Sequence, residues 1–480
     1  MEVTIRKMKF SDIDLKIKWI NNKENNKFLH YDLPLEKSKT EKWYEKNKDN
    51  KQRFDGVIVC DDMPVGLIGL LSISNDSAEY YITMGESVYK RKGIAKKASK
   101  LLIDKAFFEY NLNKIYLYTE TENISAQKLF EKLGFVKNSI EEGMVLNHGI
   151  PVNRFYYELL KKDYVKEKNK LFETPIYLLE DSDNKIFIKR DDLIPFSFGG
   201  NKARKGMLFF EEILKGKYNY IITYGSSSSN HCRVIANLAA SKKIPCIIIS
   251  PNEIDKETTN KKMMKIFDAR IINTDVKNVK ETIERTLETL KNEGFNPYFI
   301  QGGGHGNIGT RAYVDAYQEI HDYQDKKNIH FDYIFHASGT GTTQAGLVCG
   351  KILNNDDTSI IGMSIARKLP YGRDIIISSI KDYMNFINIS VDDEEIKKNT
   401  IFIDTYIDDG YGKANKNVIR IIKDTLIKYG IPLDTTYTGK AFYGMKEYLS
   451  KNDIKNKNVL FIHTGGTPLF FNDLEKFGKD

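Results

Sequence analysis

Cysteine is scarce in this chain, with four among 480 residues, and long apolar runs are missing. The cysteines keep no metal-ligand spacing and lie among apolar or small residues, so they indicate reduced core thiols and no metal site. They are Cys60, Cys232, Cys246 and Cys349. The first residues form no apolar signal region, and no run approaches the ~20 apolar residues of a membrane span. These absences predict a cytoplasmic protein with no membrane partner.

Charge of one sign is not concentrated in any segment. Lys and Arg number 73 and Asp and Glu 65, a net charge of +8, and the lysines are scattered through helical stretches. Scattered lysines are typical of solvated helix faces, so we expect no nucleic-acid partner, although the positive balance suits phosphate-bearing ligands. Hydrophobic and aromatic contents of 41% and 12% indicate a folded chain, and its length predicts roughly two to four domains.

The order of predicted strands and helices divides the chain into three parts and predicts an α/β fold class. Residues 1–160 mix strands and helices, and residues 161–172 are a charged stretch without core periodicity, which predicts a linker. Residues 173–480 alternate short apolar strands with amphipathic helices, which is typical of parallel sheets with helices on both faces. In such sheets, ligands bind at the carboxyl ends of the strands.

A basic glycine loop opens a predicted helix in the first part. The loop is Lys90-Arg91-Lys92-Gly93-Ile94-Ala95, in which the basic side chains add charge while Gly93 and Ala95 keep side-chain bulk away from a ligand. The unsatisfied N–H groups of a helix start can hold a pyrophosphate, but alone this pattern is more often ordinary helix entry. A second motif strengthens the first: Asn123 opens a helix that ends at Leu133-Gly134-Phe135.

Together the two motifs resemble those of the GNAT acetyltransferase family, over residues 1–160. The resemblance implies that acetyl-CoA binds with its pyrophosphate on the amides of Gly93–Ala95, near Lys90, and that Asn123 contacts the pantetheine arm or caps its helix. The sequence departs from the family at Phe130, where a tyrosine often protonates the leaving thiolate. Glu79 is either a base for the acceptor amine or a solvated strand residue. A fold that binds CoA without catalysis, or that only dimerises, is the alternative.

Lys202 stands at a predicted strand-to-helix junction, in Gly199-Gly200-Asn201-Lys202. Ser226–Ser229 and Asn230 open another helix; one serine would suffice as its cap, so this loop predicts ligand contacts. The loop Ser338–Thr343 has the Gly/Thr composition of a phosphate cradle but lacks the lysine of a nucleotide-binding P-loop. A phosphate site beside an isolated lysine predicts pyridoxal phosphate, held covalently by Lys202.

Residues 173–480 resemble fold-type II pyridoxal-phosphate enzymes, most closely the 1-aminocyclopropane-1-carboxylate deaminase and D-cysteine desulfhydrase family. The matching runs are Lys189–Leu193, Gly199–Lys205, Ser229–Arg233, Ala337–Thr342, Asp434–Ala441 and His463–Gly466. The resemblance implies that Lys202 forms the Schiff base, that Ser229 holds the substrate carboxylate or moves protons, and that Asn230 bonds the phenolic oxygen of the cofactor. It implies active-site tyrosines at Tyr411 and Tyr437, and a homodimer. The implied phosphate contacts are Ser338, Gly339, Thr340, Gly341 and Thr342.

Thr438 carries the main mechanistic implication, because the resemblance places it at the pyridine nitrogen, where the deaminases have a glutamate. A hydroxyl favours ring protonation less than a carboxylate does, and a neutral ring suits β-elimination or racemisation better than cyclopropane opening. His231 also fits the desulfhydrase branch, whereas Ser226–Ser228 replace bulkier residues and predict an altered substrate pocket. His463 is either a proton relay or a satisfied strand histidine.

Three functions are compatible with these features. The first is a bifunctional enzyme that eliminates a β-substituent from a small, D- or unusual amino acid, giving a 2-oxo acid and ammonia, and that acetylates an amine of unknown identity. The second is a racemase or epimerase whose amino-acid product the acetyltransferase consumes. The third is a pyridoxal-phosphate enzyme with a non-catalytic CoA-binding or assembly module, which Phe130 keeps open.

Overall fold

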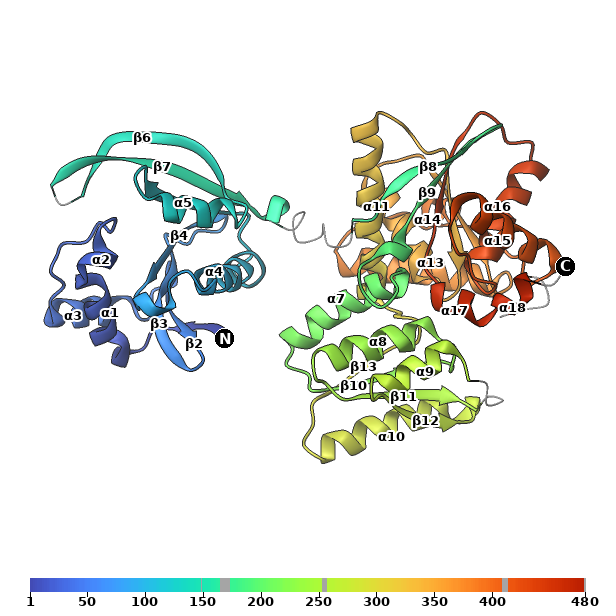
Figure 1. The fold of residues 1–480 in the computed structure, drawn as a ribbon, viewed down its shortest axis with the longest axis horizontal. Coiled ribbons are helices and arrows are strands. Elements are labelled where there is room, and N and C mark those ends of the chain that lie inside the picture. Colours follow the sequence, from blue (N-terminus) through green and yellow to red (C-terminus); the bar gives the residue numbers. More distant parts are fainter. Residues whose placement is uncertain (148, 165–172, 253–256, 408–412, 479–480) are drawn as a thin grey trace. The chain divides into compact units, whose positions relative to one another are not determined.

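The computed structural model describes residues 1–480 except 148, 165–172, 253–256, 408–412 and 479–480 (Figure 1). It divides into two compact units, Met1–Lys170 and Leu171–Asp480. The division falls inside the predicted linker 161–172, most of which lies outside the described residues. In the described part of either unit, no helix is long and apolar enough to cross a membrane.

A seven-stranded sheet forms the centre of the first unit, in the order β1-β2-β3-β4-β5-β7-β6. Its strands are β1 Val3–Lys7, β2 Phe54–Cys60, β3 Met63–Leu71, β4 Ser77–Met84, β5 Lys114–Glu120, β6 Val136–Asn147 and β7 Ile150–Leu160. Every pairing is antiparallel except that of β4 with β5, which covers only Ser77–Glu79 against Lys114–Tyr116. Beyond these residues β4 and β5 no longer pair, so the sheet is divided into two halves between these strands.

Helices pack on this sheet through apolar faces. The α-helices of the unit are α1 Ile13–Asn21, α2 Lys23–Asn26, α3 Lys37–Asn47, α4 Ile94–Asp104 and α5 Ile124–Glu131. Ala98 and Leu102 lie four residues apart on α4 and therefore on the same face of the helix. Both side chains are completely buried, in the same core as Ile115 of β5. This core holds the starts of α4 and α5 near the point where β4 and β5 part.

The second unit is built on two largely parallel sheets, which confirms the predicted α/β class. The four-stranded sheet has the order β12-β11-β10-β13, with β10 Tyr220–Tyr224, β11 Cys246–Pro251, β12 Arg270–Thr274 and β13 Pro297–Ile300. The six-stranded sheet has the order β16-β15-β14-β17-β9-β8, with β8 Ile176–Asp181, β9 Lys185–Lys189, β14 Tyr333–Ser338, β15 Ser359–Ser364, β16 Ile401–Ile403 and β17 Asn458–Ile462. Among the strand pairs that the described residues of this unit form, only β8–β9 is antiparallel.

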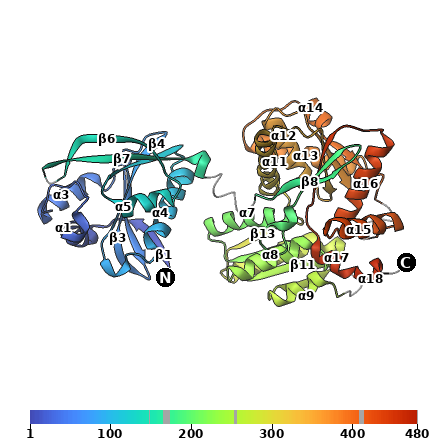
Figure 2. The ribbon, with the colours of Figure 1, turned by 45° about the horizontal axis from the view of Figure 1, so that its top comes forward.

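Helices cover both faces of these sheets, as Figures 1 and 2 show. They are α7 Asn201–Lys215, α8 Asn230–Ser241, α9 Thr259–Ile266, α10 Val279–Asn292, α11 Asn307–Lys327, α12 Thr342–Leu353, α13 Tyr371–Phe386, α14 Asp393–Asn399, α15 Lys416–Tyr429, α16 Thr438–Lys451, α17 Thr467–Asn472 and α18 Leu474–Phe477. Neighbouring strand residues point to opposite faces. In β10, Ile221 therefore packs with α7 and α8, whereas Ile222 packs with α10. In β14, Ile334 packs with α11–α13 and Phe335 with α15 and α16.

A buried ion cluster joins the end of β9 to α7 and α11. Asp191 is fully buried and accepts hydrogen bonds from Arg204 Nη2 (3.0 Å) and the Tyr313 hydroxyl (2.7 Å). Glu319 pairs with Arg204 and with Lys189, each at 2.5 Å. Burial alone would raise the pKa of Asp191, but the charges of Arg204 and Lys189 lower it to about 2. The cluster holds the start of α7 against the end of β9.

Candidate functional site

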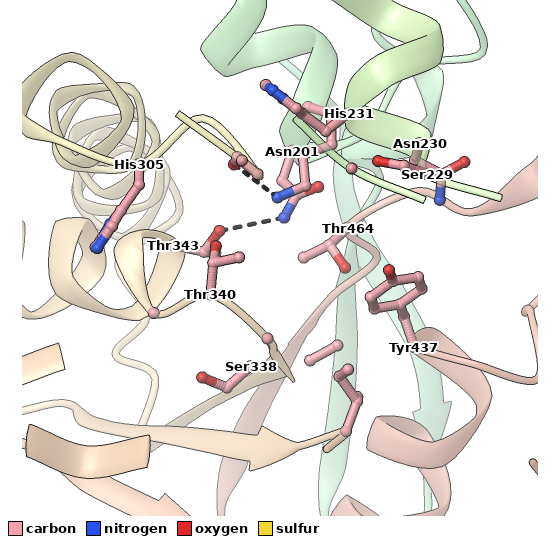
Figure 3. Close-up of a pocket in the computed structure, with 18 of the residues that line it drawn as sticks. Asn201, Ser229, Asn230, His231, His305, Ser338, Thr340, Thr343, Tyr437 and Thr464 are labelled. Carbon is pink, nitrogen blue, oxygen red and sulfur yellow. Dashed lines mark hydrogen bonds between the residues drawn. The ribbon is translucent and has the colours of Figure 1, made fainter. Parts of the chain in front are cut away.

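A cavity of about 480 Å³ opens in the second unit at the carboxyl ends of strands from both sheets (Figure 3). The segments that follow β9, β10, β13, β14, β15 and β17 line it. The predicted site residues among its lining are Lys202, Ser229, Asn230, Ser338, Gly339, Thr340, Gly341 and Tyr437. Residues from separate sequence motifs therefore face one space, as expected for the carboxyl ends of parallel strands.

Lys202 is positioned by a backbone turn that glycine adopts most easily. Gly199 and Gly200 have φ angles of +60° and +88°, and a Cβ on Gly200 would lie 2.6 Å from the carbonyl oxygen of Thr464. This close approach sets Lys202 in the first turn of α7, where its Nζ donates to the Gly303 carbonyl at 2.9 Å. Burial lowers the pKa of Lys202 to about 8, so a larger share of the amine is neutral and nucleophilic near pH 7.

The start of α12 presents backbone amides that no side chain caps. Its N-cap is Gly341, with a φ of +104°, and the loop Ser338–Gly341 lines the cavity. Free N–H groups at a helix start attract phosphate. Thr342 itself does not line the cavity, because its buried hydroxyl accepts a hydrogen bond from Lys205 Nζ at 2.6 Å. Thr343 lines it instead (Figure 3).

Ser229 and Asn230 face the cavity from the start of α8 (Figure 3). Ser229 Oγ accepts from the Cys232 amide at 3.2 Å and so caps the helix, which leaves the hydroxyl proton to be donated elsewhere. Asn230 Oδ1 accepts from Asn260 Nδ2 at 2.9 Å, an arrangement in which Asn230 keeps its own Nδ2 as a donor. A capping role and a ligand contact are therefore compatible at this loop.

Tyr437 lines the cavity, whereas its neighbour Thr438 does not. Thr438 is fully buried; its hydroxyl donates to Asp434 Oδ2 at 2.8 Å and accepts from the Asp434 amide at 2.9 Å. The contact of Thr438 with a ring nitrogen stays a prediction, and Thr464 is among the hydroxyl side chains that line the cavity (Figure 3). Tyr411, the other predicted tyrosine, lies outside the described residues.

Two histidines at or near the cavity have hydrogen-bonded ring nitrogens. His463 Nδ1 accepts from the Gly465 amide at 3.2 Å, and its Nε2 lies 3.0 Å from the Pro432 carbonyl. Both ring nitrogens are therefore used, which favours the structural alternative over a proton relay. His231 Nε2 lies 2.8 Å from Thr223 Oγ1, and burial lowers the pKa of His231 well below its usual value.

Positive charge dominates the cavity, because Lys202 and Arg367 line it and no carboxylate is among its described lining residues. Arg367 Nη1 donates to the Thr340 carbonyl at 2.9 Å, and its guanidinium lies 5.5 Å from the ring centroid of Tyr371. Burial, with the nearby cations, lowers the pKa of His305 to about 4, so this lining residue is neutral at pH 7. The sequence motifs miss Arg367, although its position directly after a parallel strand is a usable signal.

These donors fit pyridoxal phosphate. The uncapped start of α12 suits the phosphate, and the amine of Lys202 suits the aldehyde. The Nδ2 donor of Asn230 and the hydroxyls of Tyr437 and Thr464 surround the remaining space. Arg367 is a second cationic side chain among the residues that line the cavity.

In the first unit, α4 begins beside a cavity of about 670 Å³. The four residues predicted to contact acetyl-CoA, Lys90, Gly93, Ala95 and Asn123, all line it. Gly93 is the N-cap, has a φ of +76° and no side-chain cap, and a Cβ there would meet nothing within 4 Å. The first amides of α4 are therefore accessible to a pyrophosphate. Asn123 Oδ1 accepts from the Ala126 amide at 3.3 Å, so it caps α5.

A second cavity of the first unit, of about 460 Å³, adjoins the first where β4 and β5 separate. The residues that line both cavities are Phe28, Leu29, Ile82, Thr83, Asn123 and Ala126. Phe130 and Glu79 line the second cavity only. Phe130 packs edge-on against Tyr80, with ring centroids 6.0 Å apart, and offers no proton. Burial raises the pKa of Glu79, and Arg154 opposes that shift.

Comparisons with known proteins agree with this division. Residues 169–465 match the family described as pyridoxal-phosphate dependent enzyme, and residues 2–136 match the acetyltransferase (GNAT) domain. A Pyrococcus abyssi protein named "Putative 1-aminocyclopropane-1-carboxylate deaminase" is 32% identical over 62% of this chain and 91% of its own length. D-cysteine desulfhydrase of Serratia proteamaculans is 29% identical over 60% of this chain and 88% of its own. A crystal structure of an ACC deaminase homologue has 32% identity and a TM-score of 0.58, covering 64% of this chain and 93% of that one.

Proposed function

The chain belongs to the pyridoxal-phosphate dependent enzyme family and carries a GNAT acetyltransferase domain at its N-terminus, and we propose that both parts are catalytic. The second unit would eliminate a β-substituent from a small, D- or unusual amino acid, giving a 2-oxo acid and ammonia. The first unit would transfer acetyl from acetyl-CoA to an amine. The observation that carries the proposal is the convergence of Lys202, Asn230 and the start of α12 on one cavity. A homodimer, implied by the resemblance, is part of the proposal.

Different residues of the second unit would have different roles around the bound cofactor. Pyridoxal phosphate supplies an electron sink for the pair left when the α-proton is removed. Lys202 Nζ, with a pKa lowered to about 8, is suited both to holding the aldehyde and to accepting that proton. Ser229 donates its hydroxyl proton toward the substrate carboxylate, because its oxygen already caps α8. Arg367, which also lines the cavity, attracts an acid group of the substrate.

The relation between the two parts separates the leading function from its alternative. Elimination converts the amine of the substrate to ammonia, so the same molecule cannot then be acetylated. Racemisation keeps the amine and would supply an acceptor for the first unit. An N-acetylated amino acid no longer has the free amine that condenses with an aldehyde. Acetylation would therefore prevent the amino acid from reacting in the second unit.

A panel of amino acids tests the leading function. The full chain, loaded with pyridoxal phosphate, is incubated with D- and L-amino acids, with and without acetyl-CoA. We expect 2-oxo acid from at least one amino acid, and CoA thiol release with at least one amine. Inversion of configuration without 2-oxo acid would replace elimination by racemisation. A complete lack of acetyl transfer would support the non-catalytic module for the first unit.

Gly93→Ala is expected to weaken acetyl-CoA binding about 10-fold. The added methyl group enters the open space in front of the first amides of α4, where a pyrophosphate would lie. The strain of an L-residue at a left-handed φ, about 1–2 kcal/mol, is common to this variant and its control. Gly143→Ala is the matched control, because Gly143 also has a left-handed φ (+61°) but does not line the cavity. Titration calorimetry with acetyl-CoA measures both. If the two variants bind acetyl-CoA with equal affinity, the assignment of the pyrophosphate to the start of α4 is contradicted.

A further inference from the structure

A histidine–carboxylate pair lies in the second cavity of the first unit, outside the predicted site residues. His30 Nε2 is 2.8 Å from Glu120 Oε1, and both residues line that cavity. Glu120, at the end of β5, is 6% exposed, whereas His30 is 28% exposed. The pair joins segments 90 positions apart in the chain. Its buried carboxylate and accessible imidazole form an arrangement typical of a supported proton acceptor.

Glu120 is itself held in place from a third segment. Asn147 Nδ2 donates to Glu120 Oε1 at 2.5 Å and to the Lys27 carbonyl at 2.9 Å. Asn147 therefore ties the carboxylate to the loop that carries His30. A carboxylate facing Nε2 assigns the ring proton to that nitrogen, which leaves Nδ1 with the lone pair that can accept a proton.

The position of His30 relative to the two cavities, like its hydrogen bond to Glu120, indicates its function. Phe28 and Leu29, just before it, line both cavities, whereas His30 lines only the second. The cavity of about 670 Å³ contains the uncapped start of α4, which suits the pyrophosphate of acetyl-CoA. His30 therefore lies on the far side of the junction, where an amine would approach the thioester.

We propose, on the basis of the acetyltransferase activity proposed above, that His30, oriented by Glu120, takes the proton from the acceptor amine. The ammonium group loses one proton to Nδ1 of His30, and the freed electron pair of nitrogen forms the C–N bond to the thioester carbonyl. The C–S bond then breaks with its electron pair on sulfur. The second proton of nitrogen passes through solvent to the thiolate, so the products are the N-acetyl amide, CoA thiol and one proton returned from His30 to solvent.

Two observations favour His30 over Glu79, the base considered from the sequence. An imidazole is ordinarily a stronger base than a carboxylate by about two pKa units, although burial raises the pKa of Glu79 above its ordinary value. Proton transfer to imidazole is therefore the less unfavourable. Phe130 cannot protonate the leaving sulfur, so the assistance proposed for a protein group is base catalysis at nitrogen.

The other charged groups of the second cavity are engaged or lie outside the neutral range. Arg53 pairs with Asp55 at 2.7 Å, and Arg154 with Glu141 at 2.6 Å. The pKa values of Tyr31 and Tyr81 are raised above the usual value of 10. Lys16 and Glu79 are the exceptions. The Lys16 ammonium lies 3.2 Å from the ring centroid of Trp43, and burial lowers its pKa to about 8, whereas burial raises the pKa of Glu79. Any pH profile must therefore separate His30 from both Lys16 and Glu79.

The experiment measures acetyl transfer by thiol release from the full chain between pH 5.5 and 9, using the amine found active in the panel. We expect kcat/KM of the unaltered protein to rise with pH as the general base loses its proton. His30→Gln should lower kcat/KM about 100-fold and remove that rise, with acetyl-CoA affinity unchanged. Glu120→Gln should lower it about 10-fold. Lys16→Met should remove only a limb near pH 8.

Controls separate the possible failures. His330→Gln removes a half-exposed histidine of the other unit and should leave the profile unchanged. Added imidazole should restore part of the activity of His30→Ala, which a merely structural role would not allow. If the unaltered protein acetylates nothing, the proposed acetyltransferase activity and this inference fail together. If it acetylates an amine and His30→Gln keeps the rise and the rate, only the role of His30 is overturned.

Discussion

Lys202→Ala is expected to abolish the yellow absorbance of the loaded protein and to lower 2-oxo acid formation by on the order of 10³-fold or more. Lys202 Nζ is the amine of the cavity with a pKa lowered to about 8, and it lines the same cavity as the uncapped start of α12. Alanine removes both the covalent attachment and the group that accepts the α-proton. Visible absorbance and a 2-oxo acid assay on the same preparation measure the two losses.

Lys215→Ala is the matched control for this variant. Lys215 lies in the last turn of the same helix, is exposed, and does not line the cavity. It should keep colour and activity. Persistence of the colour in Lys202→Ala would assign the aldehyde to another amine. The buried Lys205, whose Nζ donates to Thr342, would then be the next residue to replace.

Asp191→Asn is expected to destabilise the second unit by about 3–5 kcal/mol. The substitution removes the carboxylate that pairs with the buried Arg204 and Lys189, and breaking a buried ion pair from one side costs about that much. Both tryptophans, Trp19 and Trp43, lie in the first unit. Tryptophan fluorescence therefore reports the first unit alone, and circular dichroism reports both.

Urea unfolding followed by both signals distinguishes this effect from general damage. The transition seen only by circular dichroism should move to lower urea, and the fluorescence transition should not move. Asp181→Asn, at the exposed end of β8, is the control and should change neither. Equal shifts in both transitions, or no shift, would contradict the assigned role of the ion cluster.

The lowered pKa of Asp191 predicts how the stability difference between the unaltered protein and Asp191→Asn depends on pH. The pKa of Asp191 is lowered to about 2 in the folded chain, against an ordinary value of about 3.9 when unfolded. A lowered carboxyl pKa stabilises the folded state above the unfolded value, and this contribution is lost as the pH falls from about 4 to about 2. The stability difference between the unaltered protein and Asp191→Asn should therefore be constant near neutrality and shrink below pH 4.

Local sequence patterns were sufficient to predict the family and the helix starts that carry the site residues. Glycines before Lys202 and at Gly341 mark turns that need positive φ, and both precede helices in the structure. The Lys90–Ala95 loop likewise opens α4. The fold class, the two resemblances and the cofactors are confirmed. The roles assigned to single residues stay predictions.

Side-chain direction could not be predicted in the same way, because it depends on contacts between distant segments. The hydroxyl of Thr342 turns to Lys205, 137 positions away, while Thr343 faces the cavity. The carboxylate of Asp434, which caps the start of α16, keeps Thr438 out of the cavity, and Thr464 reaches it from the end of β17.

The sequence by itself determined which loops bear the chemistry of this protein, since glycine conformation, helix starts and strand order are local properties. Tertiary structure alone decided which side chains of those loops meet. It placed Arg367 in a cavity without a described carboxylate, and it joined His30 to Glu120. Such pairings depend on how strands and loops pack, and packing is settled by many weak contacts that no single motif contains.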